Sequence, residues 1–277
     1  MLSIIIPVFN QASYTKACLE ALLVTCGELQ TYQVVIVDNG STDETATVIE
    51  NIKNRMPIEY IKNGRNLGFS LGSNIGAQSA KGDTFVFLNN DTIPQPGWRK
   101  ALEGCLNNRH IGIVGPRLLY PHSLKVNHAG YVTNQYVGFY AIYHNYPGDF
   151  HGVLKQRSYK ALLGACIMIR RQTFEQLNGF SEIGLEDIDI CLRTRELGLD
   201  VVYVPSAVVY HHGSVTIENS AANSMPVYTN LEFAARCKEN LENDDCRYYI
   251  EDGIMEPTSK AIEEWNQLLK KQLGLTE

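Results

Sequence analysis

The sequence predicts an α/β fold in which helices cover both faces of a mostly parallel sheet. Short apolar runs of strand length alternate with segments whose apolar residues recur at helical spacing, as at residues 2–7 and then 14–22. The runs are apolar almost throughout, which is typical of strands buried on both faces. A chain of 277 residues is also long enough to bury one large core. Together these observations favour one doubly wound domain.

The first half of the chain shows this alternation most clearly. We expect strands at residues 2–7, 34–37 and 58–62, and in the apolar run that precedes Asn89. The helices between them are expected around residues 14–22, 48–52 and 71–80. The Ser-x-x-Glu pattern at residues 41–44 predicts a capping box for the second of these helices.

The second half begins at a break formed by Pro94, Pro96 and Gly97. The elements expected after it are a helix at 98–106, strands at 111–114 and 162–169, a helix from 185, and strands at 201–204 and 208–210. Seven of the chain's 15 tyrosines lie between Tyr120 and Tyr159. They fit either a packed β-meander or an acceptor-binding wall, and both are compatible with a ring that has an apolar face and a polar tip.

The tail after residue 214 is predicted to be helical, with Pro257 at a first helical position. One of its faces is apolar, and such a face is more often core packing than a partner surface. That face consists of Ala261, Ile262, Trp265, Leu268, Leu269 and Leu273.

Composition excludes several classes of protein. The formal net charge is -6 and the chain has no dense Lys/Arg run, which argues against a nucleic-acid partner. The apolar N-terminal run lacks a basic region and is too short for a signal peptide or a membrane span. The seven cysteines include no Cys-x-x-Cys pair, and Cys18, Cys166 and Cys191 are expected to be core thiols. We expect a cytoplasmic protein; peripheral association with the inner membrane face and the oligomeric state stay open.

Polar clusters follow the predicted strands, where ligands bind in open α/β sheets. They are Asp38-Asn39-Gly40, Asn89-Asn90-Asp91, Glu186-Asp187 and His211-His212. Asp38 could accept a hydrogen bond from a nucleobase, and Asp91 could share a divalent cation with an imidazole, Mn²⁺ being favoured over Mg²⁺. Asp187 could act as a general base, with its pKa raised by the like charge of Glu186. The alternative for residues 89–92 is an ordinary turn, in which Asn and Asp are common.

Missing motifs narrow the class further. The sequence has no Gly-x-Gly-x-x-Gly after a strand and no Gly-x4-Gly-Lys-Ser/Thr loop, which argues against a dinucleotide dehydrogenase and a P-loop NTPase. It also has no Gly-x-Ser-x-Gly nucleophile elbow.

Over residues 2–213 the chain resembles the inverting glycosyltransferases of family 2, of the bacterial rhamnosyltransferase or cell-surface polysaccharide type. The matching pieces stand in the family's order, and the set is more specific than any single motif. They are Ile-Ile-Ile-Pro-Val-Phe-Asn at 4–10, Val-Asp-Asn-Gly-Ser-Thr-Asp at 37–43, Asn66-Leu67-Gly68-Phe69 with Asn74 and Gly76, Leu-Asn-Asn-Asp-Thr at 88–92, Gly164-Ala165 with Arg170-Arg171, Gly179-Phe180, Glu186-Asp187-x-Asp189-x-Cys191-x-Arg193, and Tyr210-His211-His212.

The resemblance implies a role for each matching position. Asp187 would be the catalytic base. Asp91 and His211 would hold the divalent cation, Mn²⁺ or Mg²⁺, with His212 as the alternative ligand. Acceptor or sugar contacts would come from Gly164, Ala165 and Glu186. The nucleotide sugar would be bound by Pro7, Phe9, Asn10, Asp38, Asn66, Gly68, Asn74, Asn89 and Asn90.

The resemblance also implies the GT-A (Rossmann-like) fold, with a smaller acceptor-side β region and C-terminal helices. Residues 1–214 would form the glycosyltransferase domain, with a nucleotide-sugar half at 1–92 and an acceptor and catalytic half at 93–214. Residues 215–277 would be a helical extension. The expected donor is a UDP- or dTDP-sugar, the acceptor is a glycan, lipid-linked or protein-linked hydroxyl, and the product is a glycan or cell-surface polysaccharide.

One departure from the family pattern concerns the metal. Asn89 stands where the Asp-x-Asp motif has its first acid, so metal affinity without nucleotide should be weak. Asp43 and Asp189 are expected to be structural, since both suit the first turn of a helix.

Two other functions compete with the transferase. A nucleotide-sugar-binding protein without turnover would share the fold, but Asp91, Asp187 and His211 are all intact. A sugar-phosphate nucleotidylyltransferase would need a Gly-rich, basic loop after the first strand, and residues 7–11 do not form one.

Overall fold

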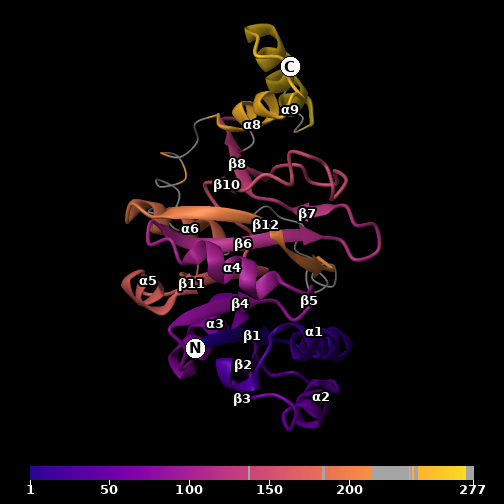
Figure 1. The fold of residues 1–277 in the computed structure, drawn as a ribbon, viewed down its shortest axis with the longest axis vertical. Coiled ribbons are helices and arrows are strands. Elements are labelled where there is room, and N and C mark those ends of the chain that lie inside the picture. Colours follow the sequence, from indigo (N-terminus) through magenta and orange to yellow (C-terminus); the bar gives the residue numbers. More distant parts are fainter. Residues whose placement is uncertain (137, 183–184, 214–236, 238, 240–242, 273–277) are drawn as a thin grey trace.

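The computed structural model describes residues 1–136, 138–182, 185–213, 237, 239 and 243–272 (Figure 1). Within these residues, one 10-stranded mixed sheet and one 2-stranded sheet are formed. The N-terminal strands, the rest of the large sheet and the C-terminal helices follow one another along the longest axis (Figure 1). The predicted α/β class, with a smaller β region and C-terminal helices, is confirmed.

The N-terminal half forms the parallel part of the large sheet, in the strand order β4-β1-β2-β3. Its strands are β1 (Leu2–Val8), β2 (Tyr32–Asp38), β3 (Ile58–Lys62) and β4 (Thr84–Leu88). Its helices are α1 (Ala12–Thr25), α2 (Thr45–Ile52) and α3 (Gly68–Ser79), with the short 3-10 helix η1 (Leu29–Thr31) before β2. Every strand and helix expected in this half is found, with small differences in its bounds.

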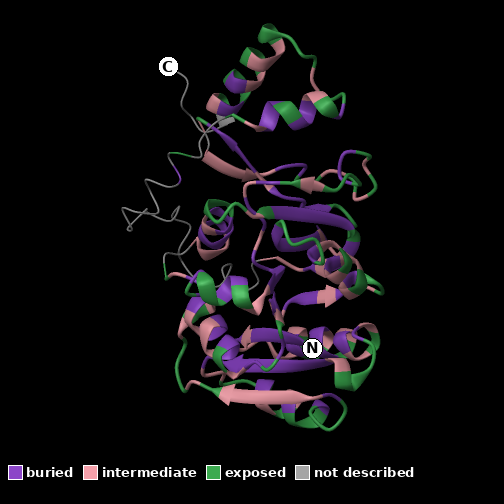
Figure 2. Ribbon diagram, turned by 60° about the vertical axis from the view of Figure 1, so that its left-hand side comes forward, coloured by how far each residue is buried: buried purple, intermediate pink, exposed green. Residues whose placement is uncertain are grey.

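Helices cover both faces of this sheet, which explains the uniformly apolar strand sequences. Ile4 and Ile36 pack in the core that includes residues of α1 and α2, whereas Ile5 and Val35 pack in the core that includes residues of α3. The central strands are accordingly buried, and the edge strand β3 is only half-buried (Figure 2).

The capping box expected at residues 41–44 is wrong. Helix α2 begins at Thr45, and Asp43 Oδ1 accepts the Thr45 N–H at 3.0 Å and its hydroxyl at 2.5 Å. Ser41 is used elsewhere, because its hydroxyl accepts the Asn10 N–H at 2.8 Å. The carboxylate of Asp43 therefore takes the place that the pattern gave to Ser41.

The second half adds antiparallel strands and makes the sheet mixed. Strand β11 (Cys166–Arg170) lies antiparallel to both β4 and β6 (Ile111–Leu119), and β12 (Asp200–His211) runs parallel to β6. The two strands expected at 201–204 and 208–210 are one strand with a register shift. The other elements of this half are β5 (Thr92–Pro94), α4 (Trp98–Leu106), α5 (Arg171–Gln176) and α6 (Glu186–Glu196).

Strand β11 begins at Cys166, four residues later than expected. The N–H groups of Leu163 and Gly164 bind side chains instead of a neighbouring strand, those of His128 at 3.0 Å and Asp187 at 3.1 Å. The apolar run therefore starts as a loop and becomes a strand only where it meets β4.

The tyrosine-rich stretch forms short strands. They are β7 (Val126–His128), which pairs with β6, β8 (Tyr131–Asn134) and β9 (Gly138–Ala141), which form the second sheet, and β10 (Arg157–Ser158), which pairs with β12. Tyr143 and Tyr159 are 1% exposed and belong to the core, so these two rings pack as the meander interpretation expects.

Helices α8 (Asp245–Glu251) and α9 (Ser259–Gln272) form the top of the molecule in Figure 1. Pro257 precedes α9 instead of occupying its first position, and the Thr258 hydroxyl accepts the Ala261 N–H at 3.1 Å. The apolar face of α9 is only partly packed, since Leu269 is 6% exposed and Leu268 is 45% exposed. Leu273 lies outside the described residues. No described helix is long and apolar enough to cross a membrane.

Two carboxylates, the buried Asp245 and the half-buried Asp244, attach these helices to the second sheet. Asp245 Oδ2 accepts hydrogen bonds from Asn134, Tyr140 and Trp265 at 2.8–3.0 Å. Asp244 Oδ1 accepts the N–H of Thr133 in β8 at 2.6 Å. The C-terminal helices are thus attached to β8 and β9 through polar contacts, and the rings of Tyr249 and Tyr248 in α8 pack against Tyr143 and Tyr159.

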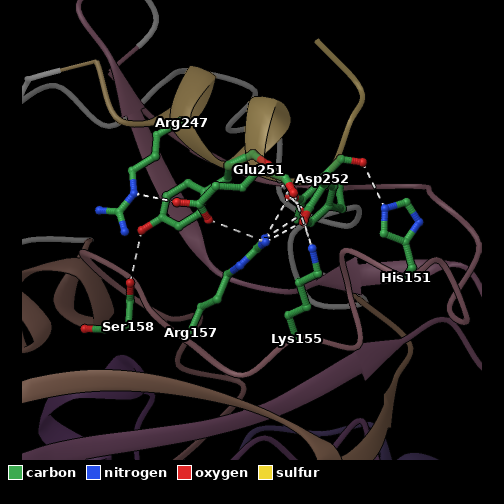
Figure 3. Close-up of polar contacts among 9 residues, drawn as sticks. His151, Lys155, Arg157, Ser158, Arg247, Glu251 and Asp252 are labelled. Carbon is green, nitrogen blue, oxygen red and sulfur yellow. Dashed lines mark hydrogen bonds and ion pairs between the residues drawn. The ribbon is translucent and has the colours of Figure 1, made fainter. Parts of the chain in front are cut away.

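Asp252, directly after α8, is the centre of a buried charge cluster (Figure 3). Its carboxylate has no exposed surface and binds Arg157 at 2.5 and 2.8 Å, Lys155 at 2.6 Å and the Tyr143 hydroxyl. Burial opposes ionisation, yet these hydrogen bonds hold the pKa of Asp252 well below its usual value. A side chain at Gly152 would collide with this carboxylate, which explains the glycine there.

We expect Asp252→Ala to destabilise the fold by about 3–5 kcal/mol, because the buried Arg157 loses its main partner. Arg247→Ala is the matched control, since its ion pair with Glu251 is exposed and should contribute less than about 1 kcal/mol. Urea unfolding measures both free energies. Similar losses in the two variants would contradict a special role for the cluster.

The lowered pKa of Asp252 also predicts that the stability of the fold depends on pH. A pKa that is lower in the folded chain than in the unfolded chain stabilises at neutral pH, and this stability is lost as the pH falls below about 4. Wild type should therefore lose more stability on acidification than Asp252→Asn does.

Candidate active site

The ends of the strands bring most of the predicted site residues to one edge of the large sheet. Asp38 is the last residue of β2, and Asn89 directly follows β4, with β1 between these two strands. Pro7 lies in β1 and Phe9 follows it, and both are half-buried. This is the edge at which open α/β sheets bind ligands.

Asp38 is held in one orientation by two donors. Its Oδ1 accepts the Ser41 N–H at 2.7 Å, and its Oδ2 accepts the Tyr60 hydroxyl at 2.6 Å. Burial and this hydrogen bond raise the pKa of Tyr60. Tyr60 therefore keeps its proton and stays a donor, and each carboxylate oxygen retains a second lone pair for a ligand. Sequence reasoning did not identify Tyr60, because no motif links it to a partner that lies 22 residues earlier in the chain.

Asn10 connects the loops after β1 and β2. Its backbone is left-handed, with φ 55°, and its Oδ1 accepts the Thr42 N–H at 2.8 Å. Asp43 binds the same pair of loops through the Ala12 N–H at 2.9 Å, as its expected structural role requires. Asn10 thus lies beside the loop that follows Asp38.

The predicted residues of the third loop also bind backbone groups. Asn66 Oδ1 accepts the Gly68 N–H at 2.9 Å, and Gly68 has a φ of 74°. Asn74 makes two hydrogen bonds to Phe180, one to its carbonyl and one from its N–H, both at 2.9 Å. Asn74 therefore joins α3 to the Gly179-Phe180 turn.

Asn90 and Asn89 differ in what they bind. Asn90 Nδ2 donates to Thr15 in α1 at 2.9 Å. The Asn89 N–H donates to the Ala165 carbonyl at 2.9 Å, which joins the end of β4 to the residue before β11. Asn90 and Asn89 thus connect the end of β4 to helix α1 and to the residue before β11.

Asp91 and His211 approach each other through one buried atom of each side chain. Strand β5 pairs with the end of β12, with Thr92 opposite His211, and this pairing brings the two residues together. Asp91 Oδ1 lies 3.4 Å from His211 Nε2. Among the described residues neither atom has a hydrogen-bond partner, although both are buried.

These two atoms fit a divalent cation. A neutral imidazole whose Nδ1 carries the proton presents a lone pair at Nε2, so two acceptors face each other and repel unless a cation lies between them. Carboxylate oxygen and imidazole nitrogen together suit Mn²⁺, and carboxylate with phosphate also admits Mg²⁺. No group of three or more His, Cys, Asp or Glu in the described ranges could hold a metal by itself.

His212 is placed differently from His211. Its N–H donates to the Asp91 carbonyl at 3.1 Å, while its ring packs edge-on against Tyr14, with centroids 4.8 Å apart. Burial lowers the pKa of His212. Of the two rings, that of His211 points a nitrogen at the Asp91 carboxylate.

Asp187 lies in the first turn of α6 and is oriented by two backbone donors. Its Oδ2 accepts the Gly164 N–H at 3.1 Å, and its Oδ1 accepts the Ile188 N–H at 2.8 Å. A side chain at Gly164 would lie 3.1 Å from the Asp187 Cβ, so this close approach favours glycine. Ala165 is buried beside it, and Glu186 is half-buried.

Burial is the main reason that the pKa values of Asp187 and Glu186 are both raised. The expected mechanism, repulsion between the two charges, is a minor contribution at Glu186 and is not among the causes at Asp187. Two backbone N–H groups lower the pKa of Asp187 in part, because they stabilise its charged form. The expected rise in the pKa of Asp187 is confirmed, but its cause is burial and not the charge of Glu186.

Two further contacts support this part of the site. Asp189 accepts hydrogen bonds from Ser181 at 2.6 Å and Arg193 at 2.7 Å, which favours the structural interpretation. Arg193 in turn binds the carbonyls of Leu177 and Gly179 at 2.5 and 2.9 Å. Asp189 thus holds the turn before α6.

The chain also matches models of two known protein families. The family model described as "Glycosyl transferase family 2" matches residues 3–177. The chain belongs to glycosyl transferase family 2. A second model, described as "N-terminal domain of galactosyltransferase", matches residues 151–214, which include Asp187 and His211.

Curated relatives match over most of this chain but are much longer. "Uncharacterized protein y4gI" of Sinorhizobium fredii is 29% identical over 233 residues, 78% of this chain and 25% of that protein. "O-antigen biosynthesis protein RfbC" of Myxococcus xanthus is 28% identical over 225 residues, 77% and 17% respectively. "Pre-mycofactocin glycosyltransferase" of Mycobacterium tuberculosis is 27% identical over 216 residues, 76% and 42%. The chain spans less than half the length of each.

Solved glycosyltransferases share the fold. GalNAc-T7 with UDP, GalNAc and Mn²⁺ superposes with a TM-score of 0.64, 18% identity, and coverage of 76% of this chain and 43% of that one. The mannosyltransferase PcManGT from Pyrobaculum calidifontis, with GDP-Man and Mn²⁺, has a TM-score of 0.59 and 18% identity. That match covers 76% of this chain and 56% of PcManGT. S. aureus TarS 1–349 with UDP-GlcNAc has a TM-score of 0.63 and 15% identity, and the match covers 89% of this chain and 69% of that one. The expected GT-A fold is confirmed.

Proposed function

We propose that this chain transfers a sugar from a nucleotide-diphosphate sugar to a hydroxyl acceptor, with inversion and with a divalent cation. The observation that supports this most is the buried pair of unpartnered atoms, Asp91 Oδ1 and His211 Nε2, at the sheet edge that also holds Asp38. Asp187, which is oriented by two backbone N–H groups, supports turnover over an inactive binding protein, because binding alone needs no base.

The donor would lie across the carboxyl ends of β1, β2 and β4. Asp38 would accept an N–H from the base, and the loops joined by Asn10, Asn66 and Gly68 would surround the nucleotide. UDP- or dTDP-sugars are the proposed donors. UDP is bound by the similar TarS and GalNAc-T7 structures, whereas GDP-Man is bound by PcManGT.

Asp187 would act as the base. Its two oxygens are fixed by the Gly164 and Ile188 N–H groups, and each retains a lone pair for the acceptor hydroxyl. As the hydroxyl oxygen attacks the anomeric carbon, its proton passes to Asp187, and the bond from that carbon to the diphosphate breaks with inversion. Glu186 and Ala165, beside this position, are the proposed acceptor contacts.

A divalent cation held by Asp91 and His211 would neutralise the charge that develops on the leaving diphosphate. Asn89 supplies a neutral amide in place of a carboxylate, so the chain alone would bind the cation weakly. The proposed acceptor is a glycan or a lipid- or protein-linked sugar in glycan or cell-surface polysaccharide synthesis, as the similarity to an O-antigen biosynthesis protein supports.

Asp38→Ala should weaken UDP binding by about tenfold or more, because the base loses a charged acceptor. Calorimetry with UDP and dTDP measures the affinity. Asp43→Ala is the control, since Asp43 binds the neighbouring loop and not the proposed base position. Unchanged affinity in the Asp38 variant would refute this assignment.

Metal removal should abolish turnover, and Mn²⁺ or Mg²⁺ should restore it. Slow hydrolysis of a panel of nucleotide sugars is a suitable measurement because it needs no acceptor. Asp91→Ala and His211→Ala should each reduce the Mn²⁺ affinity of the UDP complex, whereas His212→Ala should reduce it much less. Full turnover in EDTA would rule out a metal-dependent reaction.

Asp187→Asn should keep UDP and Mn²⁺ affinity and lose kcat by about 10²–10⁴-fold, the usual contribution of a positioned base. Glu186→Gln is the neighbouring control, and its kcat should fall less. The pH profile provides a second measurement. Because burial raises the pKa of Asp187, activity should fall on the acidic side at a higher pH than an ordinary aspartate would give. Near-normal kcat in Asp187→Asn would remove this residue from the mechanism.

A further inference from the structure

Asn127, in the middle of β7, is a buried side chain whose oxygen is directed at the metal-site histidine. It is 8% exposed, and its Oδ1 lies 2.8 Å from His211 Nδ1. The family motifs do not include this residue, and it lies 84 positions before His211 in the chain. It contacts Nδ1 of the imidazole, whereas Asp91 lies beside the other ring nitrogen, Nε2.

The chemistry of this contact assigns the proton on His211. An amide oxygen can only accept, so the hydrogen bond requires the proton to be on Nδ1. In the neutral ring Nε2 then carries a lone pair, and this is the atom that lies 3.4 Å from Asp91 Oδ1. Without a fixed partner at Nδ1, the ring could place a proton on Nε2 and would then point a donor at the cation position.

Asn127 is itself held in place by its surroundings. The His144 Nδ1–H donates to the Asn127 carbonyl at 2.9 Å, and the neighbouring residue His128 pairs with Leu118 of β6. On the other side, Gly213 has a φ of 80°, and a Cβ there would approach Asn127 Nδ2 to 3.3 Å. The amide therefore lies in a closely packed position between β7 and the end of β12.

We propose that Asn127 is a positioning residue for the cation: it fixes His211 as the Nδ1–H tautomer, so that the Nε2 lone pair faces the Asp91 carboxylate. The inference rests on the proposed function, because it assigns a role at the same cation site. Outer partners of metal-binding histidines commonly act in this way, and their loss costs about 10- to 100-fold in metal affinity.

The test compares two variants of nearly equal size. Asn127→Leu cannot accept the hydrogen bond and should weaken Mn²⁺ binding to the UDP complex by about 10- to 100-fold, measured by electron paramagnetic resonance of free Mn²⁺. Asn127→Asp keeps an acceptor and should stay within a few-fold of wild type. UDP affinity without metal should be unchanged in both. Asn134→Leu, another buried asparagine but one that binds Asp245, controls for general destabilisation.

A measurement on the wild-type chain protects the test against a variant that does not fold. Nitrogen NMR of ¹⁵N-histidine-labelled protein, with the signal assigned through His211→Gln, should show the proton of His211 on Nδ1. A proton on Nε2 would overturn the inference, and so would wild-type Mn²⁺ affinity in Asn127→Leu. Loss of Mn²⁺ binding in Asp91→Ala beside a normal Asn127→Leu would refute this inference alone. Normal Mn²⁺ binding in Asp91→Ala would instead refute the proposed metal site.

Discussion

The structure depends on the antiparallel pairing of β5 with the end of β12. Only three residue pairs form it, yet it places Thr92 opposite His211 and so brings Asp91 to the imidazole from more than 100 positions away in sequence. Asp91 follows the central strand β4, whereas His211 ends a strand on the far side of β6 and β11. The mixed sheet is therefore the framework that brings the proposed nucleotide-binding residues and the proposed catalytic residues to one edge.

The sheet holds an unfavourable pair of side chains, Asp91 and His211, at this edge. In the neutral Nδ1–H form of His211 the buried atoms Asp91 Oδ1 and His211 Nε2, 3.4 Å apart, are both acceptors, and such a pair is unfavourable unless a cation lies between them. The apolar cores on both faces of the sheet and the buried Asp252 cluster supply compensating stability elsewhere. A local conflict at a site, supported by consistent packing around it, is the usual pattern for functional residues.

The fold could be predicted well from the sequence because its information is local. Apolar runs, their spacing and the polar residues that end them fall within short windows, and the bounds of β3 and α4 agree with the structure to the residue. Errors arose where nearby side chains compete for one backbone group. Asp43, and not Ser41, binds the start of α2, and the loop before β11 is fixed by His128 and Asp187 instead of by strand pairing.

The parts of the site that sequence reasoning missed come from distant segments. Tyr60 and Asn127 belong to no motif, and their roles arise only when β3 and β7 are brought beside Asp38 and His211. The raised pKa of Asp187 was expected, but from its charged neighbour, and burial proved to be the larger cause. Burial is a property of the whole fold, so the residues adjacent to Asp187 in the sequence could not indicate it.

Strand β7 has a further consequence because its side chains serve both halves of the site. Asn127 binds His211, and the adjacent His128, kept neutral by burial that lowers its pKa to about 3, accepts the Leu163 N–H beside Gly164. Gly164 in turn donates to Asp187. Two successive residues of β7 thus contact His211 and the loop whose Gly164 orients Asp187. Any ligand at His211 that shifted β7 would therefore also change the backbone contacts around Gly164, and a linkage of this kind would be reciprocal.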